Sequence, residues 1–125
     1  MEMAAYFQSI VEQDRCPIVI CNTKHDIIYM NPAAVSRYDK RGGAGLIGQS
    51  IFDCHNAHSK KIIEQVLAWF LESPAHNIMY TYRNEKDNKD VYMVALRGSS
   101  EEVIGYYEKH EYRNAETEKT FVPVN

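Results

Sequence analysis

The stretch CPIVICNTKHDIIYMNPAA, residues 16–34, decides the fold of this chain. Two apolar runs, IVIC (18–21) and IIYM (27–30), flank the polar connector NTKHD, which predicts a β-hairpin with a five-residue loop. Asn31 and Pro32 follow directly, and small helix-forming residues come next. An asparagine accepts backbone N–H groups at a helix start, and proline loses nothing at the first helical position, where its N–H would be unpaired anyway. The sequence therefore predicts a hairpin that leads directly into a short helix.

The segment before this hairpin has the pattern of an amphipathic helix. Apolar side chains recur at helical spacing over residues 3–13, at Met3, Tyr6, Phe7, Ile10 and Val11. The helix should end at Asp14, because the residue before Pro17 disfavours the α region. We expect residues 1–14 to form an N-terminal helix apart from the main domain.

The remaining chain reads as a helical middle followed by three strands. Residues 32–38 predict two helical turns, and DKRGGAG (39–45) predicts a mobile or tightly turned loop. An apolar stripe predicts a long helix from Ser59 until Pro74 stops it. Strands are expected over three ranges, 77–83, 90–97 and 102–113. Two hairpins around a helical middle indicate an α+β fold, a five-stranded antiparallel sheet with helices on one face.

Composition narrows the classes of function. The 125 residues carry a net charge of −3, so no basic excess is present to neutralise nucleic-acid phosphates or an anionic membrane. The longest apolar run, VLAWFL, is far shorter than the ~20 residues of a membrane span. Three cysteines without short-range pairing predict reduced thiols and a cytoplasmic location. We expect neither a nucleic-acid nor a membrane partner.

The whole pattern resembles the Per-Arnt-Sim (PAS) domain family, in particular stand-alone bacterial sensor-type PAS domains. The hairpin and its Asn-Pro step are similar to the first PAS hairpin. GLIGQSIFD (45–53) resembles the segment before the central PAS helix, and GYYEKHEYR (105–113) resembles the last PAS strand. The resemblance implies a PAS domain over residues 15–113, strand order 2-1-5-4-3, and a C-terminal tail over 114–125.

The resemblance also implies a function. We expect a small sensory or protein-interaction module that binds a small ligand between sheet and helices. It would signal through a homodimer, with Tyr6, Phe7 and Ile10 on the dimer surface, or through a separate signalling partner protein. An enzyme is not expected, because an adjacent Cys-His pair does not by itself activate a thiolate and no phosphate-binding glycine loop is present. A flavin photosensor is not expected either, because the cysteine motif of that PAS subfamily is absent. A ligand-free structural dimerisation domain is the alternative from another class.

The expected pocket residues come from the strands and from both sides of the central helix start. They are Tyr29, Ile47, Phe52, Cys54, His55, His58, Ile62, Val66, Tyr80 and Met93. Cys54, His55 and His58 are chemically the richest group, since these residue types bind zinc or haem iron. Three ligands on one loop rarely complete a metal site, so one interpretation is that Cys54 packs under the helix while His55 and His58 form hydrogen bonds or cap its start. A haem-based gas or redox sensor using His58 or His55, or another metal or redox role, is the other.

Overall fold

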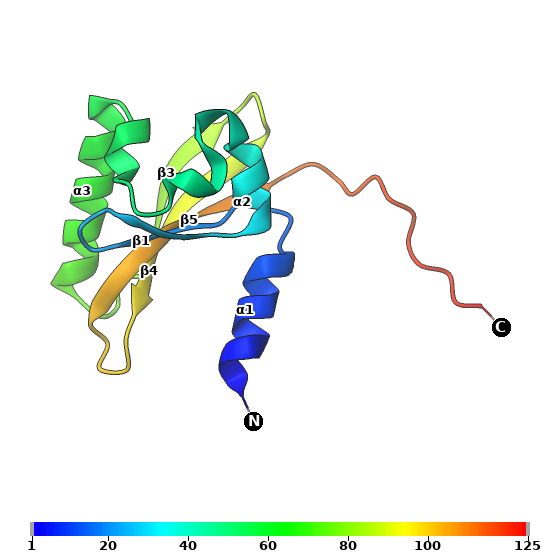
Figure 1. Ribbon diagram of the computed structural model, residues 1–125, viewed down its shortest axis with the longest axis horizontal. Helices are drawn as coiled ribbons and strands as arrows, with labels where there is room; N and C mark the ends of the chain where they lie inside the picture. Colours follow the sequence, from blue (N-terminus) through cyan, green and yellow to red (C-terminus); the bar gives the residue numbers. More distant parts are fainter. Residues whose placement is uncertain (1, 125) are drawn as a thin grey trace.

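The computed structural model describes residues 2–124 and shows a five-stranded sheet with helices on one face (Figure 1). The helices are α1 (Met3–Gln13), α2 (Pro32–Arg37) and α3 (Ala57–Glu72), with short 3-10 helices η1 (Asp39–Arg41), η2 (Gly43–Leu46) and η3 (Ile51–Cys54). The strands are β1 (Val19–Asn22), β2 (Ile27–Met30), β3 (Ile78–Asn84), β4 (Lys89–Arg97) and β5 (Val103–Tyr112). Paired neighbours are antiparallel in the order β2-β1-β5-β4-β3, which confirms the expected fold class and strand order.

Asn31 stabilises the junction between the first hairpin and the helix α2. It is fully buried, and its Oδ1 accepts hydrogen bonds from the backbone N–H groups of Ala34 and Ile18, both at 2.9 Å. Its Nδ2 donates to the carbonyls of Val11, Asp14 and Cys16 at 3.0–3.3 Å. The predicted helix cap is therefore present. The same side chain also joins the end of α1 and the segment before β1 to the start of α2.

The glycine-rich segment after α2 is tightly turned. Gly42 and Gly43 have φ values of 124° and 52°, which side chains with a Cβ rarely adopt. This geometry lets η1 and η2 follow each other without an extended loop, and Leu46 at the end of η2 is buried. Of the two expectations for residues 39–45, the tight turn is the one that the structure shows.

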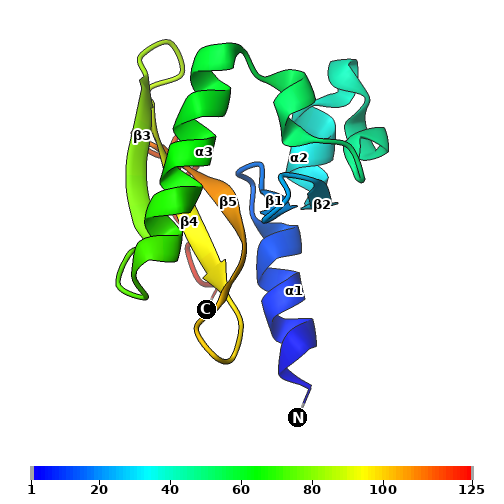
Figure 2. The same ribbon diagram turned by 90° about the vertical axis from the view of Figure 1, so that its left-hand side faces the viewer.

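The long helix α3 covers the face of the sheet formed by β3, β4 and β5 (Figure 2). Its predicted stripe is buried at Ile63, Val66, Leu67 and Phe70. The helix begins two residues earlier than expected, at Ala57, because the side chain of Asn56 accepts the N–H of Ser59 and caps the first turn.

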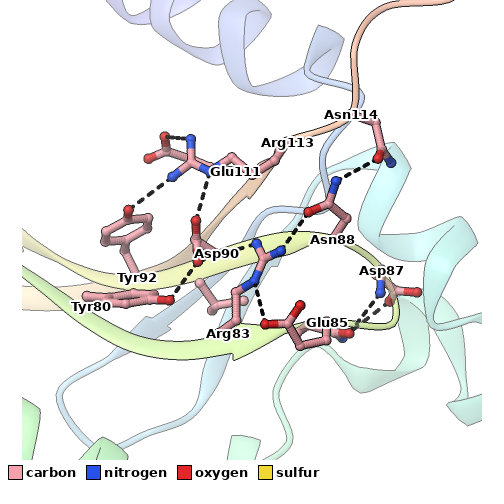
Figure 3. Close-up of polar contacts among 12 residues, drawn as sticks. Tyr80, Arg83, Glu85, Asp87, Asn88, Asp90, Tyr92, Glu111, Arg113 and Asn114 are labelled. Atoms are coloured by element: carbon pink, nitrogen blue, oxygen red, sulfur yellow. Dashed lines mark hydrogen bonds and ion pairs between the residues drawn. The ribbon is translucent and has the colours of Figure 1, made fainter.

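The outer face of the sheet carries a polar network at the end of β5 (Figure 3). Asp90 accepts hydrogen bonds from the Tyr80 hydroxyl at 2.6 Å and from Arg113 Nε at 2.8 Å, and Arg83 lies 3.6 Å away. The hydrogen bonds from Tyr80 and Arg113 lower the pKa of the Asp90 carboxyl. These contacts tie Arg113, the first residue after β5, to the β3–β4 hairpin.

The two ends of the chain extend from this body (Figure 1). The helix α1 has no buried residue, and residues 114–124 form no helix or strand. Within residues 2–124, no helix is long and apolar enough to cross a membrane.

Candidate functional site

Two cavities lie between the inner face of the sheet and the helical middle of the chain. The inner cavity has a volume of about 110 Å³, and the outer cavity, between the start of α3 and strands β3–β5, about 530 Å³. Four residues line both: His55, Ile63, Glu108 and His110. Because these residues form a common wall, we treat the two cavities as one site and call it the α3 cleft.

Strand alternation places the polar groups of β5 in this cleft. Tyr106, Glu108 and His110 stand two residues apart, so they share the face of the sheet that α3 covers. Pairing with β4 sets Glu108 beside Met93 and His110 beside Val91, both of which are buried. A carboxyl and an imidazole group therefore lie among apolar neighbours on the floor of the cleft.

Glu108 faces the cleft without a protein hydrogen bond or ion pair among the described residues. Burial raises the pKa of its carboxyl group, and the nearby His55 and Lys89 oppose that shift. A raised pKa favours the uncharged acid, which both donates and accepts hydrogen bonds. Glu108 is thus available to a bound molecule.

His110 is the second polar group without a partner. Its Nδ1 atom is buried and makes no hydrogen bond within residues 2–124. Burial, together with the positive charges of Lys89 and Arg37, lowers the pKa of His110 to about 4. The ring is therefore neutral at pH 7. A buried polar atom left unpaired is unfavourable, and a ligand group in the cleft would satisfy it.

The inner cavity is mostly apolar and has a phenol and a thiol on one side. The Tyr106 hydroxyl lies 2.7 Å from His25 Nδ1, and Cys21 lies next to Tyr106 in the wall. Burial raises the pKa of the Cys21 thiol to about 12. Cys21 is therefore a protonated thiol at neutral pH, which packs as a small apolar group and is not a nucleophile.

The glycine-rich turns border the inner cavity at both ends. Arg41, just before Gly42, lines the cavity and donates a hydrogen bond to the Cys54 carbonyl at 3.3 Å. Leu46, at the end of η2, lines it from the other side. A molecule in this cavity would therefore touch the segment that connects α2 to η3.

Half of the predicted pocket residues line the α3 cleft. Cys54 lines the inner cavity, His55 lines both cavities, and His58, Ile62 and Met93 line the outer one. The others, Tyr29, Ile47, Phe52, Val66 and Tyr80, lie outside both.

The residues outside the cleft have other packing partners. The Tyr29 hydroxyl donates to Glu12 of α1 at 2.6 Å, and Tyr80 is on the outer face of the sheet. Phe52 packs on the His25 ring at 4.4 Å between ring centres. Val66 is buried in the core below α3, and Ile47 is largely exposed.

Sequence reasoning missed the polar floor of the cleft, Lys89, Glu108 and His110, and the inner-cavity residues Tyr38, Arg41 and Tyr106. The sequence contains a pattern that predicts part of this set. In GYYEKHEYR, Glu108 and His110 follow Tyr106 at two-residue spacing, so a face that buries Tyr106 also carries them.

The described residues do not include a cluster of side chains suited to bind a metal ion. In residues 2–124, no three His, Cys, Asp or Glu side chains are grouped so that they could hold a metal ion. The inner cavity is below the ~300–1,000 Å³ typical of ligand sites, and a haem macrocycle does not fit it. His58, one of the two histidines proposed as an axial ligand, is exposed at the outer cavity and does not lie in an enclosed apolar pocket.

Comparison with known proteins gives structural relatives at low sequence identity. No protein-family model and no curated protein matches the sequence. The PAS domain of a protein from Colwellia psychrerythraea has a TM-score of 0.65 at 13% identity, covering 89% of this chain and 97% of that one. A sensory box sensor histidine kinase from Vibrio cholerae has a TM-score of 0.57 at 11% identity, covering 89% and 90%.

The Aer2 receptor from Vibrio cholerae, described as a dual PAS-heme oxygen sensor, is a third relative. Its TM-score is 0.54 at 16% identity, with 75% of this chain and 90% of that chain covered. At these identities the likeness shows a shared fold.

Proposed function

We propose that this chain, which has the PAS fold, is a small sensory module that binds a small molecule in the α3 cleft. One observation carries the proposal. The wall shared by the two cavities contains Glu108 and His110, and among the described residues neither the Glu108 carboxyl group nor His110 Nδ1 has a hydrogen-bond partner. A core stabilised only by packing would bury apolar residues at these positions. The role is one of binding rather than catalysis, in a cytoplasmic setting consistent with three free cysteines.

The signal would pass from the ligand to the helical middle and the sheet. His55 lies in the short turn between η3 and α3, and Arg41 and Leu46 lie at the two ends of the glycine-rich turns. A ligand that contacts these residues would favour one packing of the turns on the sheet over another. This is a population shift, whose size is limited by the difference in affinity between the two packings.

The N-terminal helix is the proposed dimer surface. Tyr6, Phe7 and Ile10 are exposed, Ile10 to 68%, although they form the apolar stripe of α1. Among its side-chain contacts to the body are the Tyr29–Glu12 and Asn31–Val11 hydrogen bonds near its C-terminal end, and its other end extends away from the sheet (Figure 2). An apolar stripe that the chain itself does not cover fits a second copy.

We expect the chain to sediment as a dimer, and the Phe7→Glu variant to sediment as a monomer at the same concentration. A buried, unpaired carboxylate at the centre of the contact is the reason. Gln8→Glu on the same helix adds the same charge beside the stripe and is the control. Analytical ultracentrifugation at tens of micromolar measures both. A wild-type monomer, or an unaffected Phe7→Glu dimer, would contradict the proposed surface.

Filling the outer cavity should abolish ligand retention. Thr81 is half-buried on β3 and lines this cavity, so Thr81→Phe would occupy its volume with a ring. Ile104→Phe on the exposed face of β5 is the control, because it introduces the same ring outside the cleft. We expect native mass spectrometry to show a retained small-molecule mass for wild type and Ile104→Phe only.

Other outcomes of this experiment separate the rival functions. Retention by Thr81→Phe at the wild-type level would place the ligand elsewhere. A clean dimer without added mass would favour the structural dimerisation domain. A haem mass with a Soret band that disappears in His58→Ala would favour the haem sensor.

A further inference from the structure

Lys89 is a largely buried residue whose ammonium group has no ion-pair partner among the described residues. It is the first residue of β4, only 5% of its surface is exposed, and its Nζ lies 5.3 Å from the centre of the Tyr112 ring. None of the ion pairs and side-chain hydrogen bonds found within residues 2–124 involves its ammonium group. Lysine is almost never this buried unless it is paired.

The nearest carboxyl groups do not supply the missing charge. Asp90, the next residue, points to the opposite face of the sheet, where it binds Tyr80 and Arg113. Glu108 shares the cleft with Lys89, but the two side chains do not approach within the 4.0 Å of an ion pair. The contact with the Tyr112 ring is weaker than an ion pair in the same surroundings.

The outer cavity presents a second positive element opposite Lys89. Asn56, His58 and Ser59, at the start of the 16-residue helix α3, line the same cavity. Asn56 caps the N–H of Ser59 only, so other first-turn N–H groups have no acceptor within the helix. The N-terminus of a helix favours anions through these groups and through its dipole.

One side of the outer cavity is apolar. Ile62 and Ile63 of α3 face Val91 and Met93 of β4 across it. A volume of about 530 Å³ accommodates a small organic molecule but is much larger than an inorganic anion needs. The cavity thus combines a cationic end with a surface for a hydrocarbon skeleton.

We propose that the outer cavity of the α3 cleft binds a small organic carboxylate. Its carboxylate would lie between the Lys89 ammonium and the first turn of α3, and its carbon skeleton on Ile62, Val91 and Met93. Glu108 and His110 would bind a further polar group of the ligand. Burial raises the pKa of the Glu108 carboxyl group, which favours the uncharged acid and so weakens its repulsion of the bound anion. The inference rests on the proposed function and names the ligand class.

The test compares carboxylic acids with their own primary amides. A panel of straight-chain, branched and aromatic acids of two to ten carbons, each with its amide, would be titrated into ¹⁵N-labelled protein at pH 7. We expect at least one acid to bind at least tenfold more tightly than its amide, with the largest amide shifts at the start of α3 and at Lys89. Inorganic phosphate, titrated alone, should bind at least tenfold more weakly than that acid.

Charge removal assigns the preference to Lys89. Lys89→Met keeps the length of the side chain, and the preference for acid over amide should fall to less than twofold. Lys89→Gln is the second variant should Met fold poorly, and Lys109→Met, on the exposed face of β5, should bind as wild type does. Without ligand, Lys89→Met should also unfold at a higher temperature than wild type, because it replaces an ammonium group that has no ion pair with an apolar side chain of similar length.

The outcomes separate this inference from the proposed function. If acids and amides bind the cleft equally, or if Lys89→Met keeps the preference, the carboxylate assignment is overturned while a ligand-binding cleft stands. Phosphate binding as tight as that of every acid would also overturn it. If no compound of either kind shifts residues of the cleft, the proposed function fails with it.

Discussion

The Asn31→Ala variant is expected to lose at least about 4 kcal/mol of unfolding free energy. Five hydrogen bonds end on this fully buried side chain. The alanine variant leaves two backbone N–H groups and the carbonyls of Asp14 and Cys16 without a partner, while the Val11 carbonyl still accepts the N–H of Asp14. Each buried group left unpaired costs about 1–3 kcal/mol, and access of water to some of them keeps the sum toward its lower end. Since a domain of this size is stable by roughly 5–15 kcal/mol, the variant should be close to unfolded at 37 °C.

Asn56→Ala is the matched control for this variant. Asn56 is also an asparagine N-cap, with a 2.8 Å bond to Ser59, but it is exposed and makes no further side-chain bond among the described residues. Its loss should cost about 1 kcal/mol. Asn31→Ser keeps a good N-cap without the amide donors, so it should fall between the two alanine variants.

Urea unfolding followed by circular dichroism and by Trp69 fluorescence measures all three variants. Trp69 stacks on His76 at 4.1 Å, so its emission reports on the packing of α3. Equal losses for Asn31→Ala and Asn56→Ala would show that Asn31 acts as an ordinary cap. The account of residues 16–34 as the segment that determines the fold would then be wrong.

The Arg97→Met variant is expected to lose about 3 kcal/mol. Arg97 is half-buried at the end of β4, and its guanidinium donates to the carbonyls of Phe70, Ser73 and His76 at 2.9–3.0 Å. It also donates to Asn77 Oδ1 and to the Glu101 carbonyl, both at 2.7 Å. One side chain thus satisfies the C-terminal end of α3 and joins it to two loops. Hydrogen bonds to charged groups contribute about 1.5–3 kcal/mol each, and partial solvent access lowers their sum.

Arg97→Lys separates charge from geometry. Lysine keeps a cation near the helix C-terminus, which is favourable by about 0.3–1 kcal/mol, but it lacks the planar fork that reaches five acceptors. It should therefore recover less than half of the loss. Thermal and urea unfolding measure both variants, and a lysine variant as stable as wild type would show that charge alone accounts for the effect.

The sequence predicted the fold well because its signals are local. Asn31 followed by Pro32 marks a helix start by side-chain chemistry alone, and the stripe of α3 follows a period that packing against any sheet requires. The start of α3 was placed at Ser59 instead of Ala57. Asn56 stands between two residues that are equally acceptable in a loop, so its cap is visible only once the chain has folded.

The site was less predictable because it depends on which face each strand presents. A bulge between Tyr80 and Tyr82 shifts the pairing of β3, so Tyr80 lies on the outer face while Tyr82 reaches the outer cavity. Bulges of this kind leave no clear mark in a sequence. Lys89 lies between the two ranges expected to be strands, 77–83 and 90–97, where a lysine is ordinary, and only the register of β4 with β5 shows that it is buried.

The chemistry-bearing loop residues show the same limit. Cys54, His55 and His58 have the residue types of metal ligands, yet only His55 belongs to the wall that the two cavities share. The polar floor of the cleft, Lys89, Glu108 and His110, comes from β4 and β5, more than 30 residues away from this loop along the chain. The pairing of β4 with β5 brings these residues together, and the sequence does not show that pairing directly.

The most direct test of a ligand-binding α3 cleft is the mass of the folded chain after equilibration with the small-molecule fraction of a cell extract. Native mass spectrometry should then show a discrete added mass on the wild-type protein, released on unfolding and absent from Thr81→Phe. Wild-type protein that retains nothing, or Thr81→Phe that retains the same mass, would contradict the account.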